Sequence, residues 1–112
     1  MSRHAGLQAW MLQRLSALYL AAYTLYLLWH FIRHAPDGYQ TWHAWIATPA
    51  VGISAALFFL ALLLHAWVGL RDILMDYVHT LTLRLGLTAL LLLGLTACGL
   101  WALHILWQAG YA

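Results

Sequence analysis

The chain has 112 residues, which is enough for one structural unit. Hydrophobic residues make up 65% of it and charged residues 7%, against roughly 45–50% and about 25% in soluble domains, so the composition excludes a water-soluble globular protein and indicates an integral membrane protein. The net charge of +2 is scattered along the chain and excludes a nucleic-acid-binding surface, which needs a basic patch on one face.

Three apolar runs predict three transmembrane helices. The first runs from Leu15 to Ile32, and its 18 residues span roughly 27 Å at about 1.5 Å per residue, which just crosses a bilayer core. The second runs from Ala50 to Leu70 and the third from Leu85 to Trp107. We therefore expect an all-α membrane protein with spans at about residues 15–32, 50–70 and 85–107, in a single domain over residues 1–112.

The connection between the first two spans contains a turn signal. Pro36-Asp37-Gly38 combines a fixed φ, a locally bonding carboxylate and a permissive glycine, so we expect a short, tight loop from His34 to Trp45. Thr48 and Pro49 then predict the N-cap and the first residue of the second helix. We expect that helix to continue past the lipid as far as Thr80.

The arginines predict the orientation. Four of them lie on the side of the N-terminus and the second connection, and Arg33 alone lies opposite. The positive-inside rule therefore predicts a cytoplasmic N-terminus and a periplasmic C-terminus. An aromatic belt is expected at the outer interface, formed by Trp42, Trp45, Trp101, Trp107 and Tyr111.

A polar stripe follows one face of the first span. Its members recur every three or four residues, and they are Ser16, Tyr19, Tyr23, Tyr26 and His30. Such a face should contact protein rather than lipid. Either the hydroxyls satisfy one another and a neighbouring helix, or part of the stripe borders a cofactor.

His65 is the intramembrane residue that most needs an explanation. It lies six residues before Arg71, hence about 9 Å along the helix from the first inner charge, and an ionisable group at that depth is a functional candidate. A neutral imidazole there is a metal or haem ligand or a hydrogen-bonded core residue. His30 lies about 15 Å deeper than His65, too far to share one iron. A second histidine ligand would therefore come from another polypeptide.

The helix beyond His65 carries further titratable groups. Asp72 and Asp76 follow it by seven and eleven residues and return to nearly the same face. Asp76 and Tyr77 place a phenol beside a carboxylate, which suits hydrogen bonding and protonation of a reduced carbonyl compound. Arg14, at the inner mouth of the first helix, is either an ordinary positive-inside anchor or the partner of an anion.

The segment from His65 to Val78, HAWVGLRDILMDYV, closely resembles the second helix of the small, cytochrome b556-type membrane-anchor subunit of bacterial succinate dehydrogenase, respiratory Complex II. That helix carries the pattern H-A-W-x-G…D-Y-V. The start of the first helix, Gln13-Arg14-Leu15-Ser16-Ala17, and the three-span layout agree as well. The chain departs from several relatives at Arg71-Asp72, where neutral residues are common, and has Gln8 where a histidine often stands.

The resemblance implies roles for four residues. His65 would be an axial ligand of the iron of haem b, with the other axial histidine supplied by the second membrane-anchor protein of the complex. Arg14 would lie near the haem propionates, Tyr77 would hydrogen-bond a carbonyl of ubiquinone, and Asp76 would be its neighbour in the site. The chain would be a non-catalytic subunit of succinate:quinone oxidoreductase, packed against that second anchor.

Such a subunit would tether the iron-sulfur and flavoprotein subunits to the bacterial inner membrane and take part in electron transfer from succinate to quinone. Two other hypotheses stay open. One is a structural membrane adaptor without a cofactor, in which His65 is a packed core residue. The other is a small proton-conducting or transport protein, which three spans and the absence of an internal repeat disfavour.

Overall fold

The computed structural model describes residues 3–111 of the chain. This part forms four helices, α1 (Arg3–Arg33), α2 (Tyr39–Ala47), α3 (Pro49–Tyr77) and α4 (Leu81–Tyr111). Three segments, Gly6–Arg33, Pro49–Tyr77 and Leu81–Gly110, are long and apolar enough to cross a membrane. The prediction of an all-α membrane protein with three spans is therefore confirmed.

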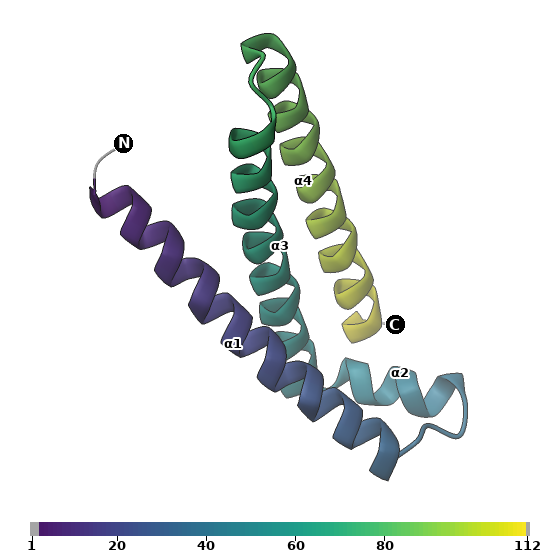
Figure 1. Cartoon of the computed structure of the whole chain (residues 1–112). Helices are drawn as coiled ribbons and strands as arrows, with labels where there is room; N and C mark the ends of the chain where they lie inside the picture. Colours follow the sequence, from purple (N-terminus) through teal and green to yellow (C-terminus); the bar gives the residue numbers. More distant parts are fainter. Residues whose placement is uncertain (1–2, 112) are drawn as a thin grey trace.

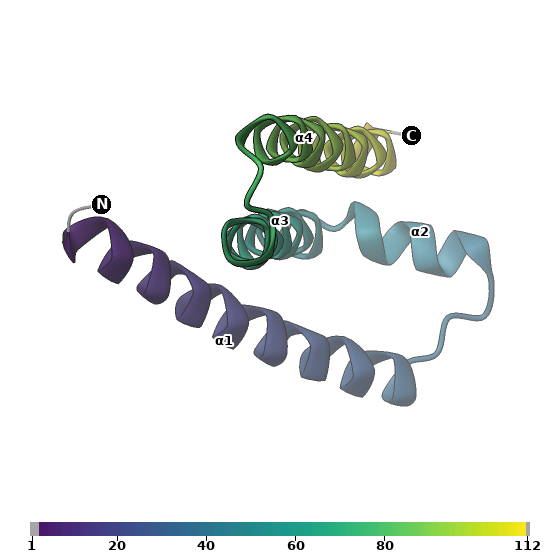
Figure 2. The ribbon, with the colours of Figure 1, turned by 45° about the horizontal axis from the view of Figure 1, so that its top comes forward.

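Helix α3 is the central element. It packs against both α1 and α4, which lie on opposite sides of it, as Figure 2 shows. Helices α3 and α4 run side by side and antiparallel, while α1 crosses α3 obliquely and diverges from it toward the start of α1 (Figure 1). The start of α1 and the α3–α4 connection lie at one end of the molecule, and α2 and the end of α4 lie at the other. The cytoplasmic placement of the first of these ends stays a prediction.

The segment between the first two spans differs from the prediction. The loop expected from His34 to Trp45 contains helix α2, which leaves only residues 34–38 non-helical, so Trp42, His43 and Trp45 lie on a helix. The ring of Trp45 stacks on His30, with ring centroids 4.4 Å apart, and packs edge-on against Phe31 at 5.3 Å. The chain leaves the helical conformation at Pro36-Asp37-Gly38, as predicted, but Gly38 is extended, and the aromatic packing of Trp45 accompanies the helix that follows.

The second span begins and ends at defined residues. Thr48 is the N-cap and Pro49 the first residue of α3, as predicted, although the Thr48 hydroxyl donates to the carbonyl of Ala44 at 3.2 Å instead of capping α3. The expected continuation to Thr80 is wrong, because α3 ends at Tyr77. There the Nε of Arg84, on α4, donates to the carbonyl of Val78 at 3.0 Å and fixes the short connection.

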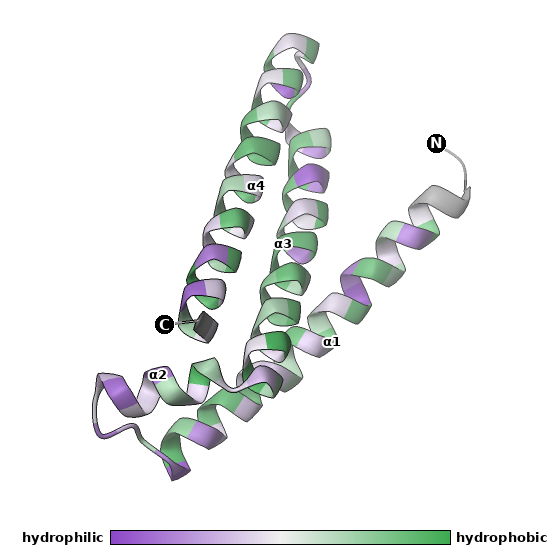
Figure 3. Cartoon of the chain, turned by 180° about the vertical axis from the view of Figure 1, so that it is seen from behind, coloured by the Kyte–Doolittle hydropathy of each residue, from purple (hydrophilic) through white to green (hydrophobic). Residues whose placement is uncertain are grey.

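Few side chains are buried within the chain. The buried residues are Ser16, Tyr23, Ala55, Val68 and Ala109. Large apolar side chains are exposed on every helix, and Figure 3 shows hydrophobic colouring along much of α3 and α4. An apolar exterior of this extent requires lipid or a protein partner. Helices α3 and α4 approach each other closely at Gly99, where an added Cβ would lie 2.8 Å from Cδ1 of Leu63.

Candidate functional site

A line of polar contacts joins α1 to α3 and is called the polar seam here. It consists of Gln13, Ser16, Tyr19, Tyr23, Ser54 and His65. At one end of it the Tyr19 hydroxyl donates to the carbonyl of Ser54 at 2.9 Å, and the Tyr23 hydroxyl lies 3.0 Å from the Ser54 hydroxyl. The predicted protein-facing orientation of the stripe is thus confirmed for its first three members. Tyr26 is half-exposed, and His30 stacks on Trp45 instead.

His65 lies at the other end of the seam. Its Nδ1 is 3.2 Å from the hydroxyl of Ser16, and its Nε2 is 3.5 Å from the amide nitrogen of Gln13. The first distance is that of an ordinary hydrogen bond, while the second is at the outer limit of one. His65 is half-buried. Its Nε2 is therefore the ring atom with unused bonding capacity.

Gln13 is a contact of His65 that the sequence analysis did not single out. It lies three residues before Ser16, so both share one face of α1. That spacing was the available signal, but it does not reveal which residue of α3 lies opposite. The Gln13 Oε1 is buried and has no hydrogen-bond partner among the described residues. Gly69 lies beside the amide, since a Cβ added there would be 3.6 Å from the Gln13 Nε2.

Arg14 follows Gln13 directly and is exposed. Its guanidinium carbon lies 5.3 Å from the centre of the Trp10 ring, a cation–π distance. A cation therefore lies one residue along the helix from the amide that touches His65.

The end of α3 carries a second group of polar residues. Arg71 and Asp72 form an ion pair at 3.6 Å, and the Arg71 Nε is buried without a hydrogen-bond partner in the described part of the chain. Asp76 and Tyr77 are exposed, with 78% of Tyr77 accessible. Tyr77 lies twelve residues beyond His65, hence about 18 Å along the helix. The structure therefore does not bring Tyr77 and His65 together.

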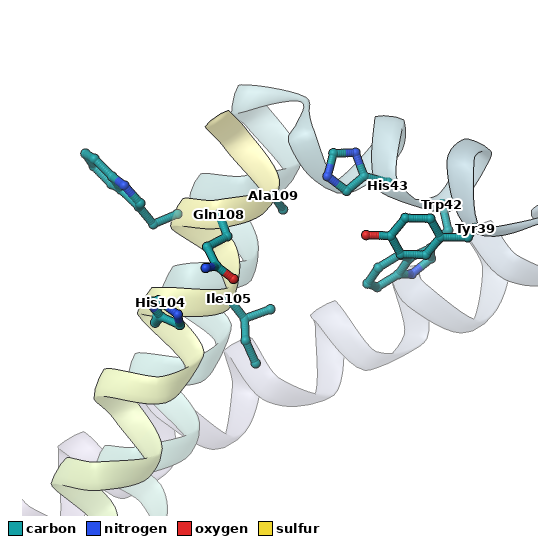
Figure 4. A pocket seen from close by; sticks show the side chains of 8 residues that line it. Tyr39, Trp42, His43, His104, Ile105, Gln108 and Ala109 are labelled. Atoms are coloured by element: carbon teal, nitrogen blue, oxygen red, sulfur yellow. The ribbon is translucent and has the colours of Figure 1, made fainter. Parts of the chain in front are cut away.

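A larger hollow lies elsewhere. It has a volume of about 780 Å³ and lies between α2 and the end of α4 (Figure 4). None of the predicted site residues lines it; the lining residues are Tyr39, Trp42, His43, His104, Ile105, Trp107, Gln108 and Ala109. A smaller hollow of about 290 Å³ adjoins the polar seam. It is lined by Leu12, Leu15, Ser16, Tyr19, Leu57, Leu60, Ala61 and Leu64.

Comparison with known proteins decides the family. Residues 1–103 match the family described as succinate dehydrogenase/fumarate reductase transmembrane subunit. The chain belongs to this family. A relative from Coxiella burnetii, named succinate dehydrogenase hydrophobic membrane anchor subunit, is 33% identical over 104 residues, which cover 93% of this chain and 90% of the relative. The resemblance inferred from the HAWVG…DYV segment is thereby confirmed.

In this transmembrane subunit the four predicted residues fall into two places. His65 lies at the end of the polar seam formed by Gln13 and Ser16, with Arg14 exposed between these two residues in the chain, and Asp76 and Tyr77 lie at the exposed end of α3. The chain is a multi-pass membrane protein, as its three long apolar helices require. The roles of these residues toward haem and quinone stay predictions.

Proposed function

We propose that the chain is the hydrophobic anchor subunit of a bacterial succinate dehydrogenase. In this role it helps bind haem b and ubiquinone, and it tethers the flavoprotein and iron-sulfur subunits to the inner membrane. The family match supports the assignment to the complex, and the name of the Coxiella burnetii relative supports the anchoring role. The extensive apolar exterior supports a chain that functions embedded in lipid and packed against another anchor subunit.

The contact pattern of His65 is the observation that carries the haem proposal. A histidine that binds iron does so as a neutral imidazole with one nitrogen lone pair free, and its other nitrogen is almost always hydrogen-bonded. His65 fits this description, because Nδ1 has a hydrogen-bond partner in Ser16 while Nε2 has only the 3.5 Å contact to Gln13. In an adaptor without a cofactor, the partner subunit would have to supply a second good hydrogen bond to this half-buried histidine.

The chain supplies one axial ligand and one counter-charge. His65 would hold the iron through Nε2, and the exposed guanidinium of Arg14 would pair with a propionate. When bound, haem b supplies one-electron chemistry through its ferric and ferrous states. His30 stacks on Trp45, near the end of α1, so the second axial histidine is assigned to the other membrane-anchor protein of the complex.

The end of α3 supplies the quinone-binding groups. The Tyr77 hydroxyl would donate a hydrogen bond to a carbonyl oxygen of ubiquinone, and the Asp76 carboxylate beside it is a group that can relay a proton from water. Both side chains are exposed in the single chain, so the partner subunits must complete the pocket. Under the predicted orientation this end faces the cytoplasm, where the iron-sulfur subunit docks.

The haem assignment is tested with the intact four-subunit complex. We expect His65→Ala to abolish the reduced b-type haem absorbance band and to lower the haem content per flavin. His104→Ala is the matched control, because His104 is an exposed histidine on α4 and its loss should leave the band unchanged. An unchanged band in His65→Ala would refute the ligand assignment, and a parent complex without haem would favour the cofactor-free adaptor.

A further inference from the structure

The hydroxyl of Ser16 makes two contacts at once. Its Oγ lies 3.0 Å from the backbone carbonyl of Gln13 and 3.2 Å from the Nδ1 of His65. A serine hydroxyl has one proton to donate and lone pairs with which to accept, whereas a carbonyl oxygen only accepts. Both hydrogen bonds form together when Ser16 donates to the carbonyl and accepts from an N–H at Nδ1. This arrangement puts the imidazole proton on Nδ1.

The side-chain amide of Gln13 is compatible with the same tautomer. Its nitrogen carries only hydrogens to donate, and it lies 3.5 Å from the Nε2 of His65. A favourable contact at that distance needs a lone pair on Nε2 rather than a proton. The two contacts of Ser16 thus favour an imidazole that is protonated at Nδ1 and unprotonated at Nε2, a form that binds a metal.

We propose that Ser16 is a positioning residue that holds His65 in this tautomer and directs its Nε2 lone pair toward haem iron. The proposal rests on the proposed function of His65 as a haem ligand. Metal-binding histidines ordinarily donate their second N–H to an acceptor, which fixes the ring and raises its basicity. Because Ser16 donates its own proton to a carbonyl, its oxygen is polarised into a better acceptor.

Among the described residues, the Ser16 hydroxyl is the hydrogen-bond partner of the His65 Nδ1. Ser16 is 6% exposed, and leucines make up most of the lining of the hollow beside it. Truncation to alanine therefore leaves the His65 N–H without an acceptor. Gln13, by contrast, is weakly held, because its Oε1 has no hydrogen-bond partner among the described residues. Its amide is the group that withdraws from Nε2 when iron binds.

The experiment compares Ser16→Ala and Ser16→Thr in the intact complex, with haem content per flavin and the haem midpoint potential as readouts. We expect Ser16→Ala to weaken haem retention roughly tenfold or more, which is the usual cost of losing such a hydrogen bond. Its midpoint potential should rise, because a less basic imidazole stabilises ferric iron less. Ser16→Thr keeps the hydroxyl and should restore both values. If Ser16→Ala does not assemble, Ser16→Cys, with its weak acceptor sulfur, should still show the raised potential.

Ser54→Ala is the matched control. It removes a hydrogen bond of the same seam, at Tyr23, and leaves the contacts of His65 in place. A purely structural role for Ser16 predicts equal effects of Ser16→Ala and Ser54→Ala on the potential, and that result would overturn the proposal. The proposal would also be overturned if Ser16→Ala or Ser16→Cys kept the haem content and midpoint potential of the parent complex while His65→Ala lost its haem. Absence of haem from the parent would instead overturn the proposed function.

Discussion

At the scale of single residues, the proposed hydrogen bond from the Tyr77 hydroxyl to ubiquinone can be tested by removing that hydroxyl. We expect Tyr77→Phe to lower quinone reduction about tenfold, since one hydrogen bond of about 1.4 kcal/mol to the substrate is lost. Succinate oxidation with an artificial electron acceptor should persist. Steady-state assays with the two acceptors check this, with Tyr39→Phe, an exposed tyrosine on α2, as the control. Equal loss with both acceptors would argue against a quinone role.

Replacement of Arg14 should shift the haem midpoint potential in the opposite direction to replacement of Ser16. Removal of a positive charge near a propionate makes ferric iron easier to form, so Arg14→Gln should lower the haem midpoint potential. Arg33→Gln is the control, because Arg33 ends α1 at the far end of the helix. Redox titration of the intact complex measures the haem midpoint potential of both variants. A potential that stays constant or rises in Arg14→Gln is incompatible with a propionate contact.

The sequence reveals some site residues and hides others for a physical reason. His65 stands out because an ionisable group inside an apolar run is costly. Ser16 belongs to a stripe that the helical period places on one face. Gln13 escapes notice, because its importance depends on where α1 crosses α3, and this crossing is determined by packing between residues 49 to 52 positions apart in the chain.

At the scale of elements, the polar seam holds α1 against α3. We expect Tyr23→Phe to destabilise the full chain in detergent by about 0.6 kcal/mol, the average value of a hydrogen bond between membrane helices. Tyr26→Phe is the control, because Tyr26 is half-exposed on the same face. Unfolding titrations of Tyr23→Phe, Ser54→Ala and the double variant should show coupling between the two positions. Strictly additive effects would contradict the hydrogen bond.

The helices themselves were predictable to different degrees. Hydropathy and length suffice for the three spans, and Thr48-Pro49 marks the start of α3 as expected. Helix α2 was missed, because its stability comes from aromatic packing of Trp45 on α1 rather than from local residue preference. The end of α3 was placed three residues late, because a side chain from the next helix, Arg84, bonds the connection.

At the scale of the whole molecule, the layout predicts which segments share a side of the membrane. With Cys98 replaced by serine, a cysteine at Thr80 should react with a membrane-impermeant maleimide only from the cytoplasmic side. A cysteine at Gln40 should react only from the periplasmic side. Thr80 is exposed in the α3–α4 connection and Gln40 is exposed in α2. These two segments lie at opposite ends of the molecule (Figure 1). Labelling of intact cells and inverted vesicles checks this. The reverse labelling pattern would show that the chain has the opposite orientation in the membrane.

The central claim is that the Nε2 of His65 is one of two imidazole ligands to an iron held between this chain and a second anchor subunit. Near-infrared magnetic circular dichroism of the oxidised intact complex tests it directly, because the position of the charge-transfer band distinguishes bis-histidine from histidine–methionine ligation. We predict a bis-histidine band in the parent and a shift to the histidine–methionine position in His65→Met. A bis-histidine band that survives His65→Met, or no haem band in the parent, would contradict the account.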